Sequence, residues 1–130
     1  MARSYHVDIA AFAADADRKW IDNLLSHFTV PGVESARRGV ARRLSLDAIR
    51  TVVLVRALSA DTGLSVDRAL ATADRLLRAS DGKTAGPSPW IALHIDRDAF
   101  DADVDRRLAA AVEAVVPRKR GRPITRREGK

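Results

Sequence analysis

Cysteine is absent from the 130-residue sequence, and aromatic residues make up only 5% of it. The lack of cysteine excludes disulfides, thiolate metal ligands and a cysteine nucleophile. No apolar run approaches the roughly 20 residues of a membrane-spanning helix, and the first residues lack the pattern of a signal peptide. We therefore expect a soluble, cytoplasmic protein with no membrane partner and a core built from Ala, Leu, Val and Ile.

Patterns typical of catalysis or metal binding are also missing. Gly82–Thr84 ends like a phosphate-binding P-loop, but Leu77 stands where that motif requires its first glycine. A calcium loop starting at Asp101 would need glycine and glutamate where Arg106 and Val112 stand. The sequence thus predicts a protein that is not an enzyme and needs no cofactor or metal.

Positive charge is concentrated at one end of the chain. The sequence has 23 basic and 17 acidic residues, a formal net charge of +6. Residues 117–130 contain seven of the basic residues and a single acid, Glu128, so residues 1–116 hold 16 of each and are neutral. A charge this localised indicates a polyanionic partner, and DNA is the obvious candidate.

The pattern within this tail is more specific than its charge. Arginine is attracted to the narrow minor groove of A·T-rich DNA, glycine lets the backbone approach closely, and proline keeps the peptide extended. The sequence Arg120-Gly121-Arg122-Pro123 resembles the core of an AT-hook, which implies Arg120 and Arg122 in the minor groove. The alternative is a generic solvated basic tail. The residues of the resemblance are Arg118, Lys119, Arg120, Gly121, Arg122 and Pro123.

Two helices separated by a tight turn are expected near the N-terminus. Residues 7–12 predict a short helix with Ile9 and Phe12 as its apolar face, and residues 17–28 predict a second, strongly amphipathic helix. In a helix-turn-helix the second helix enters the major groove. The alternative is a plain helical hairpin with a solvated polar face. The exposed residues of the second helix best suited to contact DNA are Arg18, Lys19 and Asn23.

Residues 32–44 predict a short β-hairpin that turns near Arg38-Gly39. Four arginines without an intervening acid would make this hairpin a basic wing next to the second helix. A solvated basic loop is the alternative. The arginines are Arg37, Arg38, Arg42 and Arg43.

Two more helices follow, over residues 46–60 and 66–79, capped by Ser45 and Ser65. Over residues 6–79 the order of elements resembles the winged helix-turn-helix domain of MerR-type regulators. The resemblance rests mainly on Arg42–Ile49 and Gly63–Val66. It implies that the second helix recognises DNA, although Trp20 fits the core better than a contact. The long dimerisation helix and the effector cysteines of that family are missing.

The last part of the folded chain is expected to be an appendage. Residues 80–89 read as a linker, residues 90–95 as an alternating strand, and a helix starts at Asp98, Asp101 or Asp103 and runs to about Val116. A lone strand must find a partner for its backbone. We expect it to pair with the wing hairpin or with a second chain, which would give a homodimer.

Together these patterns predict a mainly α fold with a short β-hairpin wing. The expected parts are a winged helix-turn-helix domain (1–79), a linker (80–89), a strand-helix appendage for packing or dimerisation (90–116) and an AT-hook-like tail (117–130). The expected function is binding of double-stranded, preferably A·T-rich DNA by a bacterial, nucleoid-associated transcriptional regulator. The alternatives are an architectural DNA-binding protein, and an antitoxin or adaptor whose folded part binds a protein.

Overall fold

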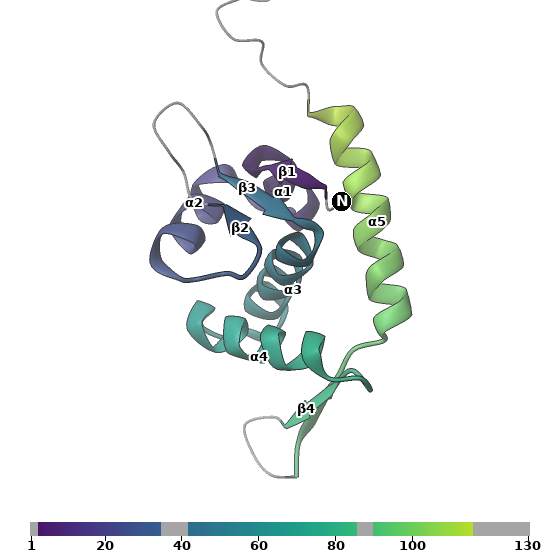
Figure 1. Ribbon diagram of the computed structural model, residues 1–130. Helices are drawn as coiled ribbons and strands as arrows, with labels where there is room; N and C mark the ends of the chain where they lie inside the picture. The colour runs from purple at the N-terminus through teal and green to yellow at the C-terminus, as the bar shows by residue number, and fades with distance from the viewer. Residues whose placement is uncertain (1–2, 35–41, 86–89, 116–130) are drawn as a thin grey trace, which may run out of the picture.

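The computed structural model describes residues 3–34, 42–85 and 90–115. These residues form a mainly helical fold with one three-stranded and one two-stranded antiparallel sheet (Figure 1). In chain order the elements are β1 (Ser4–His6), α1 (Val7–Ala14), α2 (Arg18–His27), β2 (Val33–Glu34), β3 (Arg43–Ser45), α3 (Leu46–Thr62), α4 (Val66–Arg78), β4 (Lys83–Ala85), β5 (Ala92–His94) and α5 (Arg97–Ala114). In these ranges no helix has the length and apolar character needed to cross a membrane.

Side-chain caps define where three of the helices begin. The side chains of Asp17, Ser45 and Asp96 each accept a hydrogen bond from the backbone N–H three residues later, at 2.9, 3.2 and 3.0 Å. Each cap satisfies one N–H that the first helical turn leaves without a partner. The predicted cap Ser45 is confirmed, and Asp17, the first residue of the helix predicted over 17–28, is the cap of α2. The predicted start of the last helix was wrong, because Asp96 begins α5 ahead of Asp98.

Helix α1 buries small residues rather than large ones. Ala10 and Ala13 are fully buried, whereas Phe12 is 47% exposed. The prediction that Phe12 belongs to the apolar face was therefore wrong, although Ile9 does pack against the core. The reason is that α2, α3 and α5 all pack against α1. Neighbours on several sides leave room for alanine at most positions and leave the large ring on the solvent side.

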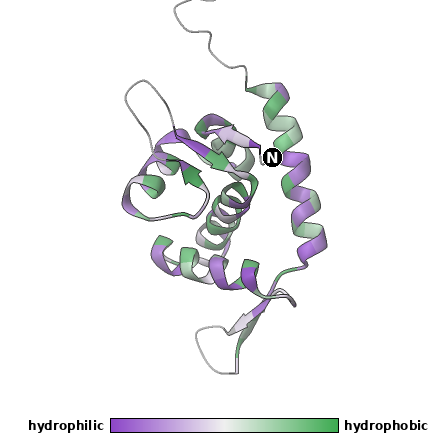
Figure 2. Cartoon of the chain, in the orientation of Figure 1, coloured by the Kyte–Doolittle hydropathy of each residue, from purple (hydrophilic) through white to green (hydrophobic). Residues whose placement is uncertain are grey.

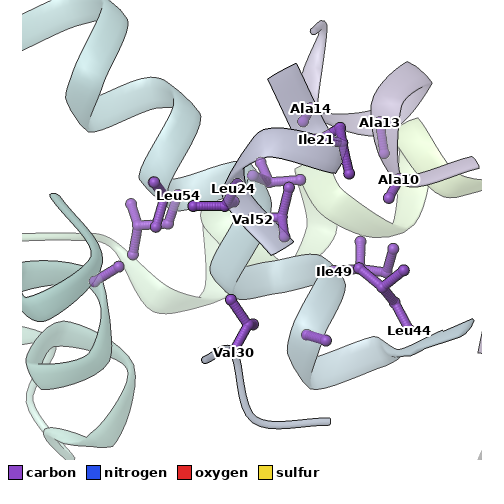
Figure 3. Packing of buried hydrophobic residues seen from close by; sticks show 14 of the residues in the cluster. Ala10, Ala13, Ala14, Ile21, Leu24, Val30, Leu44, Ile49, Val52 and Leu54 are labelled. Atoms are coloured by element: carbon purple, nitrogen blue, oxygen red, sulfur yellow. The ribbon is translucent and has the colours of Figure 1, made fainter. Parts of the chain in front are cut away.

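Helix α3 is the centre of the core, as its apolar circumference predicts. It packs against α1, α4, α5 and β3. Ile49, Val52 and Val55 are fully buried. In Figure 3 Ile21 and Leu24, from α2, gather with Val52 of α3 in one cluster of aliphatic side chains. This packing holds α2 against the core through its apolar stripe and leaves its polar side exposed.

Strand β3 lies in the middle of the three-stranded sheet, whose order is β1-β3-β2. Leu44 of β3 is fully buried and pairs with Tyr5 on one side and Val33 on the other. The antiparallel pairing of β2 with β3 confirms the strands of the predicted hairpin, whose turn lies outside the described residues. Strand β1 was not predicted, because three residues carry too short a pattern to reveal a partner some forty positions away.

The second sheet corrects two predictions. Lys83–Ala85, placed in a linker, forms strand β4, and β4 pairs antiparallel with β5 in the register Lys83↔His94, Thr84↔Leu93 and Ala85↔Ala92. The strand expected over residues 90–95 therefore pairs neither with the β2–β3 hairpin nor, through this edge, with a second chain. The argument for a homodimer from an unpaired strand is lost, because the nearest segment of the same chain supplies the partner.

Helix α5 packs along the body instead of projecting from it. Val104, Leu108 and Ala111 are buried, and α1 and α3 are its main neighbours. Val112, one residue after the buried Ala111, is 51% exposed. Figure 2 shows that α5 is mainly hydrophilic in its first turns and more hydrophobic in its last turns. In the hydrophilic half, a carboxylate oxygen of Asp101 lies 3.3 Å from Nε of Arg50 in α3, and this ion pair joins α5 to the central helix. The same oxygen lies 3.1 Å from Nε of Arg97, one turn earlier in α5.

Candidate nucleic-acid interface

The candidate interface is built on the turn that joins α1 to α2. Asp15 ends α1 in the left-handed conformation, with φ of 55°, and is the only non-glycine residue with positive φ in the described ranges. Aspartate tolerates this conformation better than most residues. Its N–H donates to the carbonyl of Phe12 at 3.1 Å, and Asp17 then caps α2. The turn is thus only three residues long, and it holds α2 against α1.

The first turn of α2 carries two cations and no acid. Arg18 and Lys19 open the helix and are both exposed. A helix N-terminus has a positive partial charge, so cations there are unfavourable unless an anion compensates them. Arg18 is compensated by two carboxylates, at 3.1 Å from Asp8 of α1 and 3.5 Å from Asp22 one turn later. No ion pair within the described ranges involves Lys19.

Arg42 brings the β2–β3 hairpin to the same place. It precedes β3, and its guanidinium lies 3.9 Å from Asp22 and donates to the hydroxyl of Ser26 at 3.3 Å. Arg18, Asp22 and Ser26 are spaced four residues apart on α2 and therefore share one stripe of the helix. Two arginines from separate parts of the chain consequently meet at one aspartate. We call this group the α2–β3 cluster: Asp8, Arg18, Asp22, Ser26 and Arg42.

The other predicted contact residues take different positions. Asn23 is exposed on α2, one position along from Asp22 and one turn after Lys19. Arg43 turns away from α2, because its guanidinium donates to the hydroxyl and the carbonyl oxygen of Ser4 on β1, at 3.2 and 3.0 Å. The structure therefore joins Arg18 and Arg42, places Lys19 and Asn23 beside them, and does not bring Arg43 into the group.

The remaining predicted contacts lie outside the described residues. These are Arg37 and Arg38, which the sequence predicts near the hairpin turn, and the tail residues Arg118, Lys119, Arg120, Gly121, Arg122 and Pro123. Their assignment to DNA binding remains a prediction from the sequence.

Trp20 was assigned to the core, and the structure agrees. Its ring is partly buried against the core cluster, and the Arg56 guanidinium lies 5.1 Å from the ring centroid. A cation above the indole face stabilises the packed ring. Trp20 therefore packs α2 against α3 and serves the core rather than the candidate interface.

Two acids, Asp8 and Asp22, belong to the α2–β3 cluster. Arg18 and Arg42 pair with Asp8 and Asp22, so these four side chains have no net formal charge, and the exposed Lys19 next to Arg18 brings the local charge to +1. The pairing of Arg18 with Asp22 can be read from their spacing of four residues. The pairing of Arg18 with Asp8 and that of Arg42 with Asp22 depend on tertiary structure, so no local sequence pattern predicts them.

Comparison with other proteins adds no further information, since no protein-family model matches the chain and neither the curated proteins nor the solved structures yield a similar protein. The described residues also hold no group of three His, Asp or Glu side chains placed to bind a metal ion. The geometry and charge of the chain itself therefore carry the functional inference.

Proposed function

We propose that the protein binds double-stranded DNA as a bacterial transcriptional regulator with a winged helix-turn-helix of MerR type. One observation carries this proposal: Arg18 of α2 and Arg42 of the hairpin share Asp22. The shared carboxylate makes α2 and the base of the β2–β3 hairpin a single surface. A recognition helix flanked by a wing is a common way to dock into the major groove.

The exposed residues of α2 suit the two kinds of contact that such docking needs. Arg18 and Lys19, at the helix N-terminus, are placed to bind phosphates together with the backbone N–H groups of the first turn. Asn23, one turn further on, has an amide that can bond to the edge of adenine. In this assignment phosphate contacts orient the helix, and Asn23 contributes to sequence preference.

The tail is proposed to act alongside this surface. Residues 117–130 hold the whole net charge of +6, and their Arg-Gly-Arg-Pro core has the chemistry of an A·T-selective minor-groove ligand. A duplex held by α2 would place an adjacent minor groove within reach of such an arm, a division of labour that homeodomains also use. This assignment rests on sequence alone.

The test for the folded surface is duplex affinity measured by fluorescence anisotropy over a salt series. The double variant Arg18→Ala/Arg42→Ala should bind about 10- to 100-fold more weakly and lose roughly 0.9 of the salt slope per phosphate contact removed. Arg78→Ala/Arg106→Ala is the matched control, because it removes two exposed arginines that are also paired with acids. If both double variants lose duplex affinity equally, net charge alone explains the loss, and this result would contradict the assignment of the α2 surface.

The tail needs its own comparison. Arg120→Ala/Arg122→Ala in the full chain should abolish the preference for A·T-rich over G·C-rich duplexes. An inosine·cytosine duplex should restore binding by the unaltered chain, because inosine lacks the guanine amino group that blocks the minor groove. Unchanged A·T preference in the tail variant would contradict the AT-hook assignment.

A protein-binding module is the second candidate, and the pairing of Asp8 and Asp22 with the arginines favours it, because paired charges attract DNA less. If the Arg18→Ala/Arg42→Ala variant binds duplexes as tightly as the unaltered chain, the folded part should be assigned to a protein partner and the tail alone to DNA. If DNA binding is retained but shows no preference among duplexes of equal base composition, an architectural role replaces regulation.

A further inference from the structure

The outer face of the β4–β5 hairpin exposes an aromatic ring between charged and small residues. Along residues 90–95 exposure alternates strictly: Ile91, Leu93 and Ile95 are partly buried, and the residues between them are exposed. Lys83 is exposed and lies opposite His94 in the sheet register. We call the exposed set the hairpin face: Lys83, Trp90, Ala92 and His94.

Trp90 is the unusual member of this face. Its side chain is 82% exposed, whereas the other tryptophan, Trp20, is packed against the core under Arg56. Burying an indole is strongly favourable, so leaving one in water gives up free energy that packing would have supplied. The hairpin has no need of the ring for its own packing, because Leu93 and Ile95 make the contacts to the core.

The hairpin face also carries a positive charge, at Lys83. Lys83 supplies a positive charge on this face and His94 an imidazole ring, whereas Arg75 of α4 donates to the hydroxyl of Thr84 at 3.3 Å on the other face of the sheet. The acid nearest in sequence to Lys83 is Asp81, which has a carboxylate oxygen that accepts the backbone N–H of Lys83 at 3.0 Å, and the acid nearest to Trp90 is Asp96, which caps α5. An exposed flat ring and a lysine on one face are the groups that bind unpaired bases and their phosphates.

We propose that the hairpin face binds single-stranded nucleic acid, with an unpaired base stacked on Trp90 and flanking phosphates near Lys83 and His94. This site is separate from the α2–β3 cluster, since Figure 1 shows β4 at the lower end of the molecule and β2, β3 and α2 in its upper half. The inference does not depend on the proposed duplex binding. A protein carrying both surfaces would hold a duplex and a nearby unpaired strand at the same time.

The experiment is fluorine NMR on the full chain labelled with 5-fluorotryptophan, whose two resonances are assigned with Trp90→Phe. An oligothymidylate of about ten nucleotides should shift the Trp90 resonance and leave that of Trp20 in place. A hairpin duplex without unpaired bases should move the Trp90 resonance much less. Binding to the tail alone would move neither signal.

Affinity for the same oligothymidylate provides the second readout. Trp90→Ala should weaken it about 5- to 100-fold, the loss expected for one stacked base, and Trp90→Phe should keep most of it. Phe12→Ala is the matched control, because it removes another exposed aromatic ring on a different surface. Arg18→Ala/Arg42→Ala should leave the Trp90 shift intact even if duplex binding fails, which separates the two proposals.

Two results would overturn the inference. One is an unmoved Trp90 resonance under conditions where anisotropy shows that the oligonucleotide is bound. The other is a Trp90 resonance that the duplex shifts as much as the oligothymidylate does, because such a shift would not require stacking on unpaired bases. In the first case the exposed indole would be assigned to a protein partner.

Discussion

Arg107 of α5 donates a hydrogen bond from Nη1 to the carbonyl oxygen of Ala13 at 2.9 Å, across 94 positions of the chain. Ala13 belongs to the last turn of α1, where carbonyl groups have no partner within the helix. Asp15 begins the turn into α2 two residues later. The last helix is therefore fastened to the element that sets the position of the candidate recognition helix.

Replacing Arg107 with alanine should lower the free energy of unfolding by about 1–2 kcal/mol, because the charged donor to a helix-end carbonyl is lost. Urea unfolding followed by circular dichroism measures this. The neighbouring Arg106, which is 75% exposed and paired with Asp103, is the control, and its alanine variant should stay within about 0.5 kcal/mol of the unaltered protein. Equal losses would show that Arg107 contributes only through its charge.

Two glycines with positive φ should respond differently to alanine. Gly32 has φ of 88°, and a Cβ there would collide with the hydroxyl of Ser45, which caps α3. Gly63 has φ of 74° and open space around it. Gly63→Ala should cost about 1 kcal/mol from backbone strain, and Gly32→Ala about 2 kcal/mol or more, because the cap is disturbed as well. Similar unfolding midpoints for the two variants would contradict the collision.

Removing the aspartate that the arginines of the α2–β3 cluster share should strengthen duplex binding. Asp22→Asn removes the carboxylate that Arg18 and Arg42 share and adds one unit of positive charge to the surface. Duplex affinity should rise about 3- to 10-fold at low salt and the salt dependence should steepen. Asp74→Asn, which releases Arg78 on α4, is the control and should change affinity less. Weaker binding by Asp22→Asn would mean that the aspartate positions the arginines for DNA.

Asp67 should titrate below its ordinary value. The hydroxyl of Ser65 donates to its carboxylate at 2.6 Å, and this bond, followed by the backbone N–H of Arg68, lowers the Asp67 pKa from 3.8. A depressed carboxyl pKa stabilises the fold at pH values above 3.8, and this contribution is lost as the pH falls through the lower folded pKa. Carbon-detected NMR titration measures the pKa directly. Ser65→Ala should raise it toward 3.8, and an unchanged value would assign the shift to the backbone.

Local sequence signals predicted the helices well because their causes are local. Ser45 was identified as a cap from its position before an apolar repeat, and the helix predicted over residues 17–28 does begin at its cap residue Asp17. The helix predicted over residues 46–60 ends close to the predicted position, at Thr62, with Gly63 as its C-cap in the left-handed conformation. Ser65 was only partly right, since it stands at the N-cap of α4 but its hydroxyl bonds to Asp67 and not to a backbone N–H.

Features that depend on distant partners were missed. Strand β4 was read as linker because Lys83–Ala85 sits among glycine, serine and proline, and only pairing with β5 makes it a strand. Phe12 was misplaced because periodicity does not show that α1 is covered on several sides. At the candidate interface the sequence identified Arg18 and Arg42, but their shared contact with Asp22 follows from the docking of the hairpin on α2.

The packing of α5 against α1 has a consequence for how the chain is made. Synthesis delivers α1 first and α5 last, so the buried side of α1 cannot be fully covered until residues 97–115 have been added. Strand β1 likewise cannot pair until β3 has been synthesised, because Ser4 of β1 pairs with Ser45 of β3. A nascent chain holding only α1 and α2 therefore exposes apolar surface that its own later segments must cover, and folding of the N-terminal half is tied to completion of α5.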